Sequence, residues 1–269
     1  MTNLDWSGNA RLFLVFMVSA LWTARPERAE ARGQAEHVVV VVWDGMRPDF
    51  VSPQYTPTLY ELALKGTFFK THHSVYVTST EVNGTALATG MHPDHSGVMA
   101  NNEYRPELNW LSSYNTENLD TVRRGDILTQ GHYLQAATVA EILQQAGIST
   151  FIAGSKPVAL LHDRAPKGGS QAQKESVTLF RGQTLPRSAL ETLTKSPDIG
   201  PFPTTQSGGS LDASSTNSPA PLEDSALPAS GKAKAPKRIP DAPGSPDSWT
   251  TKALTRGLWK RGVPKYSLL

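Results

Sequence analysis

The chain has 269 residues, enough for one large α/β domain or two small ones, since a domain of about 150 residues is common. Its formal charge of +2 indicates neither a nucleic-acid-binding surface nor attraction to an acidic membrane. It contains no cysteine, which excludes disulfides, thiolate nucleophiles and cysteine-based zinc sites, so any chemistry depends on histidine, carboxylate and hydroxyl groups.

The first predicted element is an export signal over residues 1–31. Residues 12–22 form an apolar run of signal-peptide length, too short to cross a bilayer, and Arg11 precedes it. Residues 29–31 read Ala-Glu-Ala, which fits the small-x-small pattern of a cleavage site. We therefore expect an exported protein, periplasmic or secreted, with no stable membrane span after cleavage. An N-terminal core helix or an uncleaved anchor is the alternative.

A run of β-branched and apolar residues at 37–43 is the next predicted element. Both faces of this run are apolar, which is typical of a central strand in a parallel sheet that helices cover on both sides. The run ends at Asp44 and Gly45, where a polar loop begins. Ligand sites of open α/β sheets gather at the carboxyl ends of strands, so Asp44 is a candidate site residue.

Helices and strands then alternate within residues 32–203. The predicted elements are a helix that Thr56 caps and Gly66 ends, a strand from Thr67 to Val77, a helix from Thr80 to Thr89, a helix that Thr138 caps and Gly147 ends, and a strand over 148–153. This alternation predicts a three-layer α/β/α sandwich around a mostly parallel sheet.

The last 66 residues divide into two segments of different composition. Residues 204–248 are rich in Ser, Pro, Ala, Gly and Thr, and cannot bury enough apolar surface to offset the entropy of ordering, so we expect a disordered low-complexity insert. Residues 249–269 predict a helix to about Lys260 and then the start of a strand from Val263. Since the sequence ends inside this strand, we expect the sandwich to be incomplete at its C-terminal side.

Three residues together indicate phosphoryl chemistry: Asp44, Thr80 and Asn101. Thr80 opens a predicted helix, where the helix dipole and free backbone N–H groups favour a phosphate and a developing alkoxide. A carboxylate at a neighbouring strand end can bind a divalent cation beside that hydroxyl and make it a nucleophile at neutral pH. Taken singly, Asp44 would be a turn residue and Thr80 a helix cap, so the prediction depends on their combination.

The same region resembles the N-terminal catalytic segment of the type I phosphodiesterase/nucleotide pyrophosphatase family, within the alkaline phosphatase superfamily. Residues 44–47 match its Asp-Gly-x-Arg motif, and residues 56–63 match Thr-Pro-x-Leu-x-x-Leu-Ala. Residues 78–83 match in part the nucleophile motif Thr-x-Thr-Phe-Pro-Asn. Residues 89–93 match Thr-Gly-x-x-Pro, and residues 97–101 match the run Gly-Ile-x-x-Asn.

This resemblance implies an alkaline-phosphatase-like fold and an enzyme that hydrolyses small phosphoester or nucleotide substrates. It implies that Asp44 and Thr80 are metal ligands, that Thr80 is also the nucleophile and forms a phosphothreonine intermediate, and that Asn101 binds a non-bridging phosphate oxygen. The cofactors it implies are two divalent metal ions, with zinc as the expected ion.

The sequence departs from the family pattern at two places that affect function. Glu81 and Val82 replace Phe-Pro, which places an additional negative charge beside an anionic substrate. The family's remaining metal-binding motifs are absent from residues 147–269, and His162 and Asp163 stand in the reverse of the expected order. We therefore expect the chain by itself to be inactive. The alternatives are a non-catalytic exported remnant or binding protein, or a phosphomonoesterase of the same superfamily.

Overall fold

The computed structural model describes residues 35–203 and 244–269. The export signal predicted over residues 1–31 and most of the insert predicted over 204–248 lie outside these ranges. Within the described ranges, no helix combines the length and the apolar composition needed to cross a bilayer.

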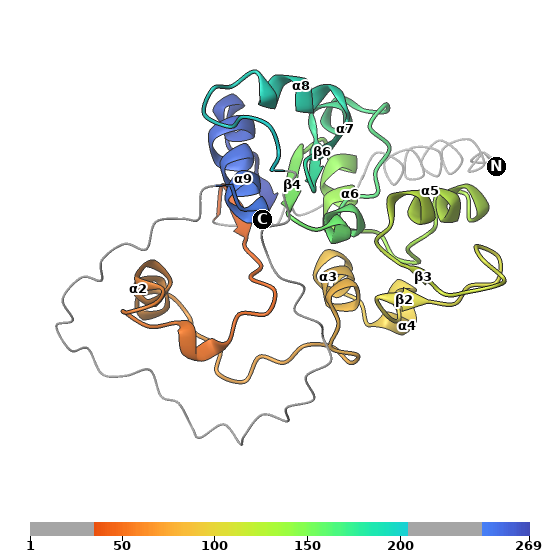
Figure 1. Ribbon diagram of the computed structural model, residues 1–269, viewed down its shortest axis with the longest axis horizontal. Coiled ribbons are helices and arrows are strands. Elements are labelled where there is room, and N and C mark those ends of the chain that lie inside the picture. Colours follow the sequence, from red (N-terminus) through yellow and green to blue (C-terminus); the bar gives the residue numbers. More distant parts are fainter. Residues whose placement is uncertain (1–34, 204–243) are drawn as a thin grey trace, which may run out of the picture. The chain divides into compact units, whose positions relative to one another are not determined.

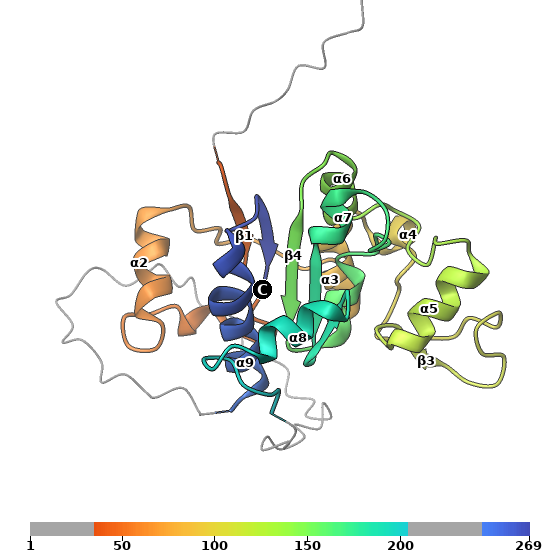
Figure 2. The ribbon, with the colours of Figure 1, turned by 90° about the horizontal axis from the view of Figure 1, so that it is seen from above.

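A five-stranded, mostly parallel sheet organises the chain from His37 onwards. Its strands lie in the order β1 (Val38–Val40), β7 (Tyr266–Leu268), β4 (Thr150–Gly154), β5 (Val177–Phe180) and β6 (Gln183–Leu185). The first four strands run parallel, and β6 returns antiparallel to β5. The last strand in the sequence, β7, therefore lies between β1 and β4, as Figure 2 shows. The predicted mostly parallel α/β sheet is confirmed.

Helices and one hairpin complete the described chain. The helices are α2 (Pro57–Lys65), α3 (Thr80–Thr89), α4 (Pro93–Ser96), α5 (Leu119–Leu128), α6 (Val139–Gln145), α7 (Gln171–Glu175), α8 (Ser188–Thr194) and α9 (Pro246–Lys252). Shorter turns are the 3-10 helices η1 (Pro48–Phe50), η2 (Pro157–Leu161) and η4 (Leu258–Arg261), and the π-helical turn η3 (Ala253–Gly257). Strands β2 (Asn102–Glu103) and β3 (Tyr114–Asn115) form a separate antiparallel hairpin.

Alternate side chains of β4 separate two apolar cores. Phe151 and Ala153 face α8, α9 and η3, where Leu193, Trp249 and Leu254 are buried. Ile152 faces the opposite side, with residues of α6 and η2. Figure 1 shows α9 on one side of β4 and α6 on the other. Because successive residues of a strand point to opposite faces, this alternation produces the predicted helix–sheet–helix layering.

The position of the first strand differs from the prediction. Residues 37–43 were expected to form a central strand covered on both faces, but β1 is an edge strand whose one hydrogen-bonded neighbour in the described sheet is β7. Val38 and Val39 are 46% and 43% exposed. A continuous apolar run indicates a strand suited to burial, but its place in the sheet depends on pairing, and here the C-terminal strand β7 takes the interior position.

The strand predicted from Thr67 to Val77 is wrong, because this segment has no strand partner. The Asn83 side chain instead satisfies its backbone. Asn83 Oδ1 accepts from the Val75 N–H at 2.9 Å, and Asn83 Nδ2 donates to the carbonyls of Val77 and Ser79 at 3.3 and 3.1 Å. A side chain that hydrogen-bonds the backbone competes with a sheet ladder, so the segment forms a loop that leads into α3.

The predicted helices are present, but Thr56 makes no side-chain cap, because its hydroxyl donates to the Phe50 carbonyl at 2.7 Å, and the C-terminal helix has other bounds. Thr80–Thr89 is helical and ends at Gly90 in the left-handed conformation, and Thr138 caps α6 through a capping box with Glu141. The helix expected from Trp249 begins earlier, at Pro246, inside the range predicted to be disordered. The Ser245 hydroxyl accepts from the Ser248 N–H at 3.0 Å, and Pro at the first helical position completes this start signal.

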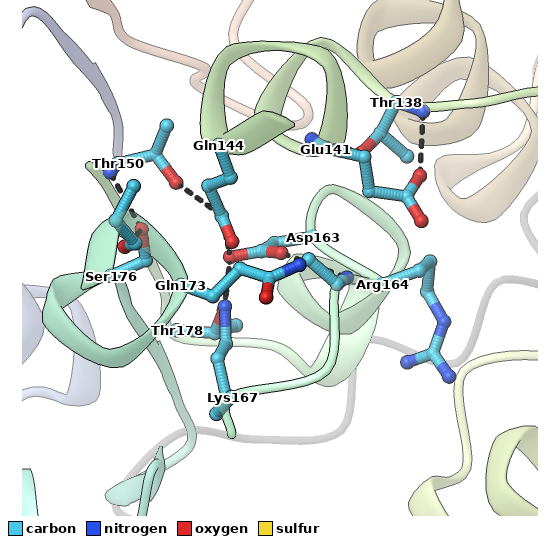
Figure 3. Close-up of polar contacts among 12 residues, drawn as sticks. Thr138, Glu141, Gln144, Thr150, Asp163, Arg164, Lys167, Gln173, Ser176 and Thr178 are labelled. Carbon is cyan, nitrogen blue, oxygen red and sulfur yellow. Dashed lines mark hydrogen bonds and ion pairs between the residues drawn. The ribbon is translucent and has the colours of Figure 1, made fainter. Parts of the chain in front are cut away.

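A buried polar cluster joins the end of η2 to α6 and β5. The Asp163 side chain is fully buried, and its Oδ2 accepts from Gln144 Nε2 at 2.9 Å and from Thr178 Oγ1 at 3.2 Å. The same oxygen forms an ion pair with Lys167, and Oδ1 accepts from the Ala165 N–H at 3.1 Å. Figure 3 shows the Asp163 carboxylate between these side chains. Asp163 therefore holds elements of the fold together.

Candidate functional site

Asp44 and Thr80, separated by 36 residues in sequence, meet at one end of the sheet. Asp44 follows β1, and Thr80 is the first residue of α3. The Thr80 Oγ1 donates a hydrogen bond to Asp44 Oδ2 over 3.1 Å. Asp44 is half exposed and Thr80 is partly buried, so both are accessible from solvent. The pair predicted from the sequence is thus brought into contact.

Asn101 lies at the N-terminus of the same helix. Its Oδ1 accepts from the Glu81 N–H over 3.2 Å. Thr116 holds the Asn101 backbone, because its N–H and its hydroxyl both donate to the Asn101 carbonyl, over 3.0 and 3.1 Å. The first turn of a helix leaves N–H groups without partners inside the helix, and Asn101 takes one of them here, that of Glu81; the positive dipole end of α3 favours an anion. The Asn101 amide NH2 group, not used in the bond to Glu81, adds a further donor at this helix end.

Lys156 also belongs to the site, and the sequence analysis did not identify it. It lies two residues beyond the end of β4, and its Nζ is 2.7 Å from Asp44 Oδ2. This hydrogen bond lowers the pKa of Asp44 and raises the pKa of Lys156, while partial burial opposes both shifts. Its position at the carboxyl end of a parallel strand was the one signal in the sequence that could have identified it.

A carboxyl pair lies at the N-terminal end of α3, next to Thr80. The Glu81 side chain is buried, with 4% of the residue exposed, and it interacts with the partly buried Glu117. Burial, followed by the charge and hydrogen bonding of Glu81, raises the pKa of Glu117 to about 7, and the charge of Lys156 opposes this. The sequence predicts that Glu81 adds charge beside the substrate, but the structure buries this carboxyl group among protein side chains.

The histidines do not join the Asp44–Thr80 pair. His95 is exposed, and its Nε2 lies 3.6 Å from Asp94 Oδ2. His162 is buried against α3, where a Cβ added at Gly84 would lie 3.6 Å from its Nε2. Burial lowers the pKa of His162 to about 4, so its imidazole is neutral at pH 7.

The described residues do not fit the two-metal centre that the sequence analysis expects. Residues 35–203 and 244–269 contain no group of three or more His, Cys, Asp or Glu side chains that could hold a metal ion. Asp44 and Thr80 together offer two oxygen atoms, fewer than the three protein ligands of a typical catalytic zinc site. All seven histidines lie within the described ranges, so none outside them can add a ligand.

Comparison with known proteins identifies one family. The model of the type I phosphodiesterase/nucleotide pyrophosphatase family matches residues 38–196, which is more than half of the chain. This match includes Asp44, Thr80, Asn101 and Lys156. No solved structure matches the chain.

Proposed function

Because the chain belongs to the type I phosphodiesterase/nucleotide pyrophosphatase family, we propose that it is built for hydrolysis of small phosphoester or nucleotide substrates through a phosphothreonine at Thr80. One observation carries the proposal: the Thr80 hydroxyl stands at the N-terminus of α3 and donates to the Asp44 carboxylate over 3.1 Å. A hydroxyl whose hydrogen bond is accepted by a base, at the positive end of a helix, has the environment that a phosphoryl-transfer nucleophile requires.

In this proposal the Thr80 Oγ attacks phosphorus in line with the departing oxygen, forming the Thr80–phosphorus bond as the bond to the leaving group breaks. Asp44 accepts the hydrogen bond of the attacking hydroxyl, orients it and takes its proton as the new bond forms, while solvent protonates the departing oxygen. The amides of the first turn of α3 and the NH2 group of Asn101 stabilise negative charge on the transferring group. Water then hydrolyses the phosphothreonine and releases phosphate or a phosphomonoester.

Metal dependence is part of the proposal. The family implies two divalent ions, with zinc as the expected ion, of which Asp44 and Thr80 would hold one only in part; bound ions would stabilise charge on the reacting oxygens. Two oxygen ligands hold zinc weakly, so we propose that this chain by itself binds no zinc tightly and is inactive. Export is proposed on the apolar run at residues 12–22, which precedes the described residues.

The test measures zinc content and hydrolysis of bis-p-nitrophenyl phosphate by the purified chain, beside Thr80→Ala. Thr89→Ala is the matched control, because Thr89 lies on the same helix and its hydroxyl donates to the Thr85 carbonyl. We expect no tightly bound zinc and no hydrolysis by the unmodified chain.

Hydrolysis that Thr80→Ala abolishes and Thr89→Ala retains would support the nucleophile and refute the inactivity. A phosphoryl adduct on Thr80, found by intact-mass and peptide-mass analysis after incubation with the substrate, would show the intermediate directly. Hydrolysis that survives Thr80→Ala at full rate would show that the nucleophile assignment is wrong.

A further inference from the structure

Lys156 occupies a position that the local backbone builds for it. Gly154 ends β4, and a Cβ at that residue would lie 3.1 Å from the Lys156 carbonyl oxygen and 2.9 Å from the Ala159 Cβ. Pro157 then begins η2 directly after Lys156. The close approach at Gly154 lets the chain turn sharply at the sheet edge, and this turn places the Lys156 side chain beside Asp44.

Lys156 and Thr80 share one acceptor atom. The Lys156 Nζ and the Thr80 Oγ1 lie 2.7 and 3.1 Å from the same oxygen, Asp44 Oδ2. The ammonium group therefore lies beside the nucleophile. The side chains of Lys156 and Asp44 are 56% and 49% exposed, and an ion pair this exposed is weak and exchanges readily. An anion that arrives at Thr80 can thus draw the ammonium group from Asp44.

The negative charges around Thr80 would repel an anionic substrate, and the Lys156 ammonium group opposes this repulsion. Asp44, Glu81 and Glu117 place three carboxyl groups near the nucleophile, and the electrostatic interactions of Lys156 extend to all three. Within residues 35–203 and 244–269, no other lysine or arginine forms an ion pair or hydrogen bond with Asp44 or Thr80. Without Lys156, an anionic substrate at Thr80 would meet the half-exposed Asp44 carboxylate with only neutral donors to oppose it.

We propose that Lys156 binds a non-bridging oxygen of the phosphoryl group that Thr80 attacks, and is a substrate-binding residue of this site. The inference rests on the proposed function. It adds to the site a residue, Lys156, that lies outside the motifs matched in the sequence. Lysine binds phosphate as a point charge, through an ammonium group with three N–H donors. The Lys156 ammonium group can therefore donate to a phosphoryl oxygen in place of Asp44, or to both.

The experiment is a calorimetric titration of the full chain with inorganic phosphate at low ionic strength, which needs no catalysis. We expect Lys156→Met to weaken phosphate binding by about tenfold or more, and Lys156→Arg to stay within about threefold of the unmodified chain. Lys260→Met is the matched control, since Lys260 forms an equally exposed ion pair with Asp198, 57% and 53% exposed, at 3.4 Å. This control should bind phosphate as the unmodified chain does.

The inference would be overturned by equal phosphate affinity in Lys156→Met and the unmodified chain, or by no phosphate binding by the unmodified chain. Loss of binding in Lys260→Met as well would assign the effect to general surface charge and would also overturn it. The Thr80 experiments are independent of this result. Phosphate binding that depends on Lys156, together with hydrolysis that survives Thr80→Ala at full rate, would refute the proposed nucleophile and leave the anion site in place.

Discussion

Replacing Asp163 by asparagine should strongly destabilise the chain. Asp163→Asn keeps the size of the side chain but removes the charge that faces the Lys167 ammonium group, whose side chain is 12% exposed. Burial lowers the pKa of Lys167, and the charge of Asp163 opposes that shift. The new amide would also bring its own hydrogens toward the donors of Gln144 and Thr178.

The magnitude follows from leaving one member of a buried ion pair without its partner, which costs about 3–5 kcal/mol. Typical domains are stable by about 5–15 kcal/mol, so the variant should lose a large fraction of its free energy of unfolding. Asp198→Asn is the control, because the Asp198–Lys260 pair spans 3.4 Å and both side chains are more than half exposed. Removing such an exposed pair should cost about 1 kcal/mol or less.

The assay is urea unfolding followed by tryptophan fluorescence, which the six tryptophans of the chain, with Trp249 buried, make sensitive. Asp163→Asn combined with Lys167→Met removes the uncompensated charge and should recover part of the lost stability. If Asp163→Asn and Asp198→Asn cost the same, or if the double variant is less stable than Asp163→Asn, the interpretation of the cluster would be wrong.

Two further predictions concern buried positions. Gly125→Ala should lower the free energy of unfolding by about 1–2 kcal/mol, because the added Cβ would lie 2.2 Å from the buried Tyr133 ring and this overpacking exceeds the gain of about 1 kcal/mol in helix propensity. In urea unfolding, the control Gly168→Ala should change the free energy of unfolding little, because its Cβ meets open space. An unchanged free energy of unfolding in Gly125→Ala would contradict the packing argument. The pKa of His162 falls from 6.5 to about 4 on burial, so its contribution to stability is complete above pH 6.5 and is lost as pH falls toward 4, by up to about 3 kcal/mol. Urea unfolding of His162→Phe across this range should show a smaller decrease than the unmodified chain, and an equal decrease would refute the assignment.

Local signals in the sequence predicted the helices α2, α3, α6 and α9, and they selected the three candidate site residues. Thr138 with Glu141 forms a capping box, and its geometry depends only on residues three apart. Asp44 and Thr80 were predicted together because one follows a strand and the other begins a helix, and their contact is confirmed. Asn101 was expected near the phosphate-binding end of α3, and it hydrogen-bonds the first turn of that helix.

Contacts between residues distant in the sequence determined the strand order and the remaining site contacts. The sequence by itself determined that residues 37–43 are strand-like and that Thr80 opens a helix, because periodicity and capping are local properties. Only the tertiary structure placed β7 between β1 and β4, left β1 at the sheet edge, and let Asn83 hold residues 75–79 in a loop. It also brought Lys156 to Asp44 across 112 residues, because parallel strands carry distant sequence positions to the same edge of the sheet.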